Sequence, residues 1–139
     1  MVVLDTHAWI WTVAGDAGRF GRRTRGVIAR AAAADAIRIS AATLFEIVAL
    51  HVSGRLRLSR PPDQWLREAL DLPGTRLAPL TGAMAIDAGY IPRTALTDPL
   101  DRLLVATARQ LGATFVTADT RIIEYARAAG QSNVHDAAT

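Results

Sequence analysis

The sequence of 139 residues contains no cysteine and no lysine, and each absence excludes classes of chemistry. Without cysteine, the chain has no disulfide bond, no thiolate nucleophile and no sulfur-ligated metal site. Without lysine, it carries neither a Walker-type phosphate-binding loop nor a Schiff base. Any enzymatic function must therefore rest on other side chains.

Long apolar runs are also missing. No uninterrupted apolar run approaches the roughly 20 residues that a helix needs to span a bilayer. The first residues lack the basic segment and the small-residue cleavage site of a secretory signal. We therefore expect a soluble, cytoplasmic protein with no membrane association, and the length predicts one domain over residues 1–139.

Arginine supplies all of the positive charge of the chain. All 16 basic residues are arginines, and the net charge is +3. Arginine pairs well with phosphate, so this balance is compatible with a nucleic-acid partner. The 27 alanines equally indicate a compositional bias of the source genome. Charge alone leaves both interpretations open.

Short apolar runs alternate with longer segments of helical period, which predicts an α/β fold with a mainly parallel central sheet. A polar connection is expected at 92–99, and the tail 131–139 is expected to be an edge strand or disordered. Strands are expected at 2–4, 37–40, 75–80 and 113–119, and helices at 6–15, 20–36, 41–54, 63–70, 82–91, 100–112 and 120–130.

Two of the expected strands are followed by an aspartate, Asp5 and Asp119. In a parallel sheet this places both carboxylates at the carboxyl edge, where ligands bind. Each aspartate also precedes a helix, so an ordinary N-cap is an equally good interpretation. Glu46 is different because it lies inside a helical segment, where capping does not explain it. It is either on the exposed face of that helix or directed inward toward other charges or a metal.

Asp98 and Asp101 occur in the segment "TDPLDRLL" and fall on the same side of a first helical turn. Asp98 followed by Pro99 predicts a helix cap, with Asp101 three residues on as a capping-box variant. A helix start directed at the carboxyl edge of the sheet is also a place where an acid can join a cluster with Asp5 and Asp119.

Carboxylates gathered at one edge repel one another unless a divalent cation lies among them. Oxygen ligands without cysteine or clustered histidines favour Mg²⁺ or Mn²⁺ over zinc. Such a site suits hydrolysis of phosphodiester bonds. Among the histidines only His7, close to Asp5, is a candidate to join it.

Four blocks of the sequence resemble PIN-domain proteins of the bacterial VapC toxin type. The blocks are "VVLDTHAWIW", "ISAATLFEIVAL", "DPLDRLLVATARQLGATFVTAD" and the "TRI" that follows the last acid. The resemblance implies a three-layer α/β/α domain whose acidic pocket binds Mg²⁺ or Mn²⁺ and cuts RNA. It also implies a homodimer that is held inactive by a cognate VapB-type antitoxin.

Carried over by position, the resemblance assigns the catalytic and metal-binding acids to Asp5, Glu46, Asp101 and Asp119. The resemblance also makes Asp98 a candidate metal ligand, and it favours Asp101 over Asp98 as the main third ligand. Thr6 and Thr117 match hydroxyl residues beside the acids and are expected to hydrogen-bond ligand carboxylates.

The hypothesis is therefore a metal-dependent endoribonuclease that acts as the toxin of a toxin–antitoxin pair. The alternative is a catalytically silent PIN-like module that binds RNA or a protein. A third class, the phospho-acceptor receiver domain, also places aspartates at strand ends but needs a lysine that this chain lacks.

Overall fold

Five parallel strands form the central sheet of the computed structural model, which describes all 139 residues. Every neighbouring pair is parallel, in the order β3-β2-β1-β4-β5. The parallel sheet predicted from the sequence is confirmed. The strands are β1 (Val2–Leu4), β2 (Ile37–Ser40), β3 (Thr75–Ala78), β4 (Thr114–Thr117) and β5 (Val134–Asp136).

All seven predicted helices are present, and a short 3-10 helix, η1 (Ala17–Arg19), follows the first of them. None of them combines the length and the apolar character needed to cross a membrane. The helices are α1 (Thr6–Ala14), α2 (Arg22–Ala33), α3 (Ala41–Val52), α4 (Pro62–Leu70), α5 (Gly82–Tyr90), α6 (Pro99–Gln110) and α7 (Thr120–Ala128).

Helix α2 is shorter than the expected 20–36. Phe20 is extended and buried in the core, so the helix begins only after it. Gly21 precedes the helix and lies against the C-terminus, where a Cβ atom would stand 2.3 Å from the carbonyl oxygen of Ala138. At the other end, Asp35 adopts a left-handed conformation with φ of 55°, which turns the chain into β2. A tertiary contact therefore sets the start of α2, and the backbone conformation of Asp35 marks its end.

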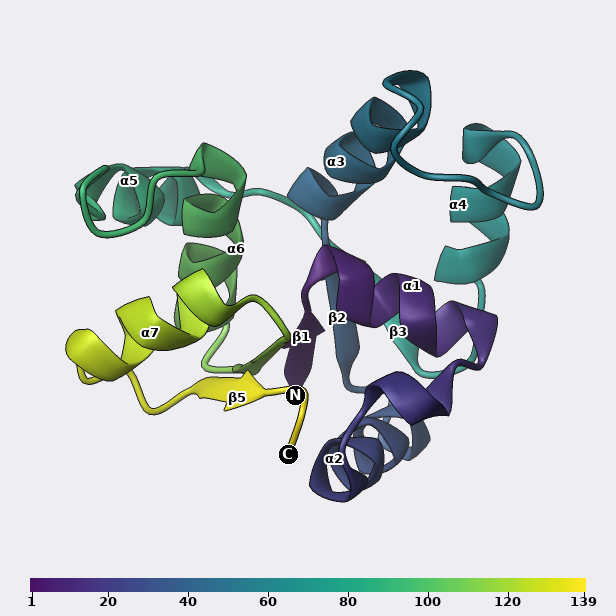
Figure 1. Ribbon diagram of the computed structural model, residues 1–139, viewed down its shortest axis with the longest axis horizontal. Helices are drawn as coiled ribbons and strands as arrows, with labels where there is room; N and C mark the ends of the chain where they lie inside the picture. Colours follow the sequence, from purple (N-terminus) through teal and green to yellow (C-terminus); the bar gives the residue numbers. More distant parts are fainter.

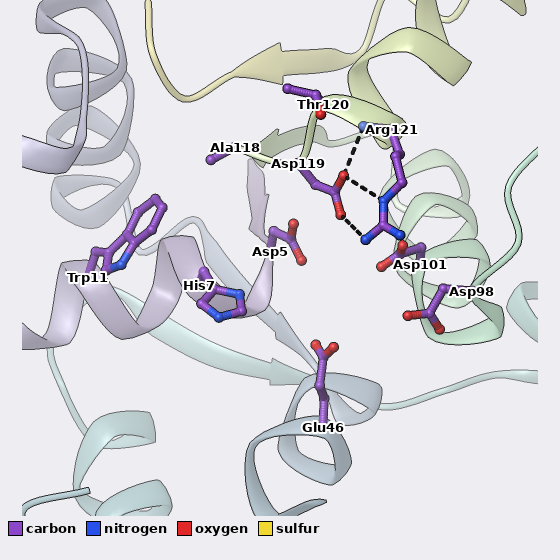
Figure 2. A pocket seen from close by; sticks show the side chains of 10 residues that line it. All are labelled: Asp5, His7, Trp11, Glu46, Asp98, Asp101, Ala118, Asp119, Thr120 and Arg121. Carbon is purple, nitrogen blue, oxygen red and sulfur yellow. Dashed lines mark hydrogen bonds and ion pairs between the residues drawn. The ribbon is translucent and has the colours of Figure 1, made fainter. Parts of the chain in front are cut away.

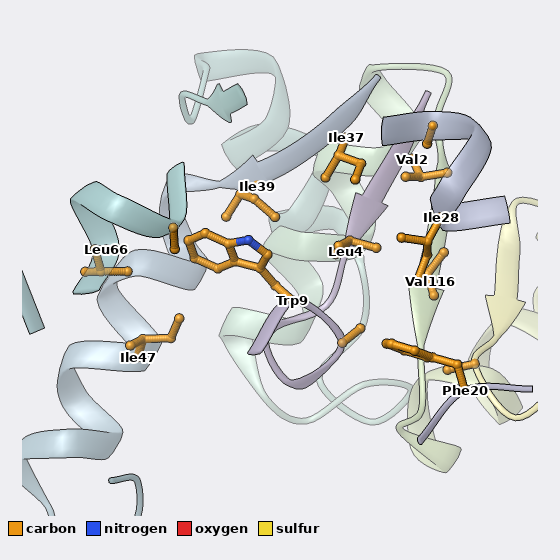
Figure 3. Packing of buried hydrophobic residues seen from close by; sticks show 14 residues of the cluster. Val2, Leu4, Trp9, Phe20, Ile28, Ile37, Ile39, Ile47, Leu66 and Val116 are labelled. Carbon is orange, nitrogen blue, oxygen red and sulfur yellow. The ribbon is translucent and has the colours of Figure 1, made fainter. Parts of the chain in front are cut away.

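Helices cover both faces of the sheet (Figure 1). Val2 and Leu4 point to one face, where they pack with residues of α1, α2 and α4 around the buried Trp9 (Figure 3). Val3, between them, points to the opposite face and packs with Phe115 and the residues of α6 and α7. The alternation of strand side chains thus divides the core into two halves, and the expected three-layer α/β/α fold is confirmed.

The tail forms the edge strand β5, which pairs with β4. The hydroxyl of Thr24 in α2 lies 2.7 Å from Nε2 of His135, and the backbone N–H of Arg23 donates to the carbonyl of Thr139. These contacts hold the C-terminus close to the start of α2. Of the two expectations for the tail, the strand is correct.

The register of β1 against β4 brings Asp5 and Asp119 to the same edge of the sheet. Leu4 pairs with Val116, and the backbone N–H of Asp5 donates to the carbonyl of Val116. The ends of β1 and β4 therefore stand side by side, and the residues that follow them meet at the carboxyl edge.

Candidate functional site

A pocket of about 470 Å³ opens at the carboxyl edge of β1 and β4. Figure 2 shows acidic side chains directed into it from four separate segments of the chain. All five acids singled out from the sequence line this one pocket. Its lining residues are Asp5, His7, Trp11, Glu46, Asp98, Asp101, Ala118, Asp119, Thr120 and Arg121.

Asp5 has two roles in the structure. Its Oδ1 accepts a hydrogen bond of 2.8 Å from the backbone N–H of Thr6 and so caps α1. Its Oδ2 accepts a bond of 2.5 Å from the hydroxyl of Thr117, which is fully buried. Burial raises the pKa of Asp5, and the bonds from Thr117 and Thr6 act against that rise. Asp5 therefore caps α1, as one interpretation predicts, and also lines the pocket at the carboxyl edge.

Glu46 lies in the second turn of α3, which is capped by Ser40. Its side chain lines the pocket, so the interpretation as an ordinary exposed helix residue is wrong. The hydroxyl of Thr6 donates to its Oε1 and lies 3.3 Å from the hydroxyl of Thr43. Desolvation raises the pKa of Glu46, although the Thr6 bond opposes it, and the charge of Asp5 adds to the rise.

Asp98 and Asp101 flank the start of α6. Asp98 caps the helix, because its Oδ1 accepts a bond of 2.9 Å from the backbone N–H of Leu100. Asp101 is only 7% exposed and takes part in none of the ion pairs of the molecule. Burial and the charges of Asp98, Asp5, Asp119 and Glu46 raise its pKa to about 7. Asp101 is therefore a buried carboxyl surrounded by the charges of the other four acids of the pocket.

Asp119 is held by the chain on both sides. Its backbone N–H donates to the hydroxyl of Thr117 across 3.0 Å, and its Oδ1 accepts from the backbone N–H of Arg121 at 2.9 Å. The guanidinium of Arg121 also approaches it, with 3.4 Å between Nη2 and Oδ2. Neither Arg121 nor Thr43 is predicted from the sequence as a site residue, although the "TRI" block contains the arginine.

The donor set of this pocket suits a hard divalent cation. Carboxylate oxygens are the preferred ligands of Mg²⁺ and Mn²⁺. A cation would offset both the burial and the mutual repulsion that raise the pKa values of Asp5, Glu46 and Asp101. In the present arrangement no three histidine or acidic side chains converge to hold one ion together. Side chains such as Asp119, now turned to Arg121, would have to rotate toward the ion.

Comparison with known proteins identifies the family of this chain. The sequence matches the PIN domain family over residues 2–128. The chain belongs to the PIN-domain family. It is 31% identical over 121 residues to Ribonuclease VapC22 of Mycobacterium tuberculosis (strain ATCC 25618 / H37Rv), an alignment that covers 87% of this chain and 88% of the relative. The resemblance to VapC-type PIN domains seen in the sequence blocks is confirmed.

Two solved structures share the fold of this PIN domain. VapBC2 from Rickettsia felis, bound to a DNA fragment from their promoter, aligns with a TM-score of 0.65 at 17% identity and covers 98% of both chains. DNA-bound VapBC from Salmonella typhimurium aligns with a TM-score of 0.60 at 22% identity, over 88% of this chain and 89% of that one.

Proposed function

We propose that this PIN domain is a Mg²⁺- or Mn²⁺-dependent endoribonuclease, the toxin of a VapBC-type pair, that hydrolyses RNA in the cytoplasm. The observation that carries the proposal is that carboxylates from four separate segments line a single pocket. The 31% identity to a protein named a ribonuclease supports the same activity.

Asp5, Glu46, Asp101 and Asp119 would hold the cation, and Asp98 lies beside them. A bound divalent cation supplies the positive charge that activates a water molecule and offsets the charge developing on the attacked phosphate. Two threonine hydroxyls hydrogen-bond to the carboxylates that would bind the cation. Thr117 holds Asp5 and Thr6 holds Glu46, so these hydrogen bonds orient both carboxylates and oppose the rise of their pKa values.

Asp101, rather than Asp98, is the better third ligand. The Oδ1 of Asp98 already accepts the cap bond from the start of α6, whereas Asp101 is buried and engaged in no ion pair. A buried carboxylate with raised pKa gains most when a cation neutralises its surroundings.

The protein partners would be a VapB-type antitoxin and a second copy of this chain. Large apolar side chains remain exposed on α3, where Val52 is 79% exposed, and on α5, where Tyr90 is 82% exposed. The first belongs to an apolar groove of about 480 Å³ between α3 and α4. Surfaces of this kind support protein contacts. Light scattering of the purified chain, alone and with a co-expressed antitoxin, would measure both.

The activity is tested with single-stranded RNA and the purified, antitoxin-free protein. We expect cleavage with Mg²⁺ or Mn²⁺, and loss of cleavage with EDTA or in Asp5→Asn. Asparagine is as good an N-cap as aspartate, so this variant should keep α1 intact. The matched control is Asp71→Asn at the exposed end of α4, which should cleave as the wild type does. Cleavage that persists in EDTA or in Asp5→Asn contradicts the proposal.

A further inference from the structure

The acidic pocket is continuous with a second pocket. The second pocket has a volume of about 360 Å³, and the two share Asp98, Asp101 and Arg121 as lining residues. The second pocket also has Tyr125 in its wall. A flexible chain that occupies both pockets must therefore pass Arg121.

Arg121 is the only arginine in the lining of either pocket. Figure 2 shows its guanidinium turned back to Asp119. The two side-chain contacts, at 3.4 and 3.5 Å, are long for charged hydrogen bonds, and the side chain of Arg121 is 76% exposed. An exposed ion pair of this geometry is weak and readily exchanged.

The surroundings favour a cation at this position. Besides Asp119, the charges of Asp101 and Asp98 stabilise the guanidinium of Arg121. RNA brings the opposite problem, because each phosphate that enters a pocket lined by five carboxylates is repelled. A guanidinium on the path between the pockets can bind a phosphate with two parallel hydrogen bonds.

We propose that Arg121 binds a backbone phosphate of the RNA beside the cleaved one, and that it occupies Asp119 until the divalent cation and the RNA bind. This inference rests on the proposed function, since it concerns the same pocket. It makes Arg121 a substrate-binding residue that is also a competitor of the metal for Asp119. Removal of Arg121 should then weaken RNA binding and strengthen metal binding at the same time.

The first measurement is Mn²⁺ affinity without RNA, by isothermal titration calorimetry. Arg121→Ala should bind Mn²⁺ about two- to fivefold more tightly than the wild type, the range expected for loss of a weak competing ion pair. Arg127→Ala is the matched control. It removes the same charge from an exposed position of the same helix, but Arg127 lines neither pocket.

The second measurement is binding of a fluorescent single-stranded RNA in Mn²⁺ by anisotropy, with Asp5→Asn in every variant so that the RNA stays intact. Arg121→Ala should weaken binding about tenfold. It should also reduce the slope of log K against log salt by about 0.7, the value for one phosphate contact. Arg121→Lys should restore the slope but only part of the affinity, and Arg127→Ala should match its parent.

Two results would overturn the inference. One is an Arg121→Ala protein whose RNA affinity and salt slope equal those of Arg127→Ala, and the other is an unchanged Mn²⁺ affinity. The proposed function fails differently, through a wild-type protein that binds no divalent cation or cleaves no RNA. The two failures are therefore distinguishable.

Discussion

The hydroxyl of Thr117 donates a hydrogen bond to Oδ2 of Asp5 across 2.5 Å and so joins the carboxyl ends of two neighbouring strands. The hydroxyl oxygen of Thr117 also accepts a hydrogen bond from the backbone N–H of Asp119. One fully buried hydroxyl thus positions two of the pocket acids. Its bond also lowers the pKa of Asp5 against the larger effect of burial.

Thr117→Val should remove that support while keeping the shape of the side chain. Without the hydroxyl, the pKa of Asp5 rises further and its carboxylate is less well oriented for a cation. We expect Mn²⁺ affinity and RNA cleavage to fall by about 10- to 100-fold, as for other residues that hold metal ligands. Thr117→Ser retains the donor and should keep most of both. A valine variant with unchanged metal affinity would contradict this role.

Glu46→Gln tests the acid that capping does not explain. The glutamine keeps the size of the side chain and its contact with Thr6 but removes the charge. We therefore expect RNA cleavage to fall by about 10- to 100-fold. Its melting temperature should not decrease, because burial already disfavours the ionised form. Glu68→Gln, at an exposed position within α4, is the control and should cleave normally. Equal rates in the two variants would exclude Glu46 from the reaction.

The raised pKa of Asp101 predicts that the metal-free protein becomes less stable as the pH rises. The folded protein holds the Asp101 proton up to about pH 7, whereas the unfolded chain releases it near the ordinary value of 3.8. The folded state therefore binds more protons in this window, and the free energy of unfolding should fall as the pH rises through it and level off above pH 7. Urea unfolding in EDTA at several pH values would measure this slope.

Asp101→Asn should flatten that slope. At about pH 8 the variant should be more stable than the wild type, by on the order of 2 kcal/mol, because an ionised buried carboxylate is gone. It should nevertheless lose RNA cleavage. Asp71→Asn, which changes an exposed acid, should keep the wild-type slope. Parallel curves for wild type and Asp101→Asn would show that Asp101 is not the group that titrates.

Much of the fold could be predicted because local patterns and tertiary structure agree. The apolar runs at β1 and β4 are buried on both faces, as their sequences indicate, and Gly15 ends α1 in a left-handed conformation with φ of 70°. The start of α2 could not be predicted, because the C-terminus that packs on Gly21 lies more than 110 residues away in the sequence.

The acids of the site could be predicted by topology, since residues that follow parallel strands meet at one edge. Arg121 could not, because 16 arginines are available and nothing local indicates which of them turns back to a carboxylate. Thr43 was missed for a related reason. It is an ordinary helix residue until the fold brings α1 and α3 together and places it beside Thr6.

Asp87, which lies outside the pocket, joins α5 to α6. Its Oδ2 accepts bonds of 2.9 Å from both Nε of Arg109 and Nε2 of Gln110, and its Oδ1 accepts from Nη2 of Arg109 at 2.5 Å. The pKa of Asp87 is lowered mainly by the hydrogen bond from Arg109. Its contribution to stability should therefore be present above pH 3.8 and disappear as the pH falls through the lowered value.

Asp87→Asn should lower the free energy of unfolding at pH 7 by about 1 to 2 kcal/mol, since it weakens a charged, two-pronged pair with a half-buried arginine. The difference from wild type should shrink as the pH falls below 3.8 and through the lowered pKa of Asp87. Asp16→Asn breaks a more exposed pair with Arg19 and should cost at most about 0.5 kcal/mol. RNA cleavage should be unchanged, because Asp87 lines neither the acidic pocket nor its neighbour. If Asp87→Asn also loses RNA cleavage, the contact between α5 and α6 helps to position Asp101, which lies on α6.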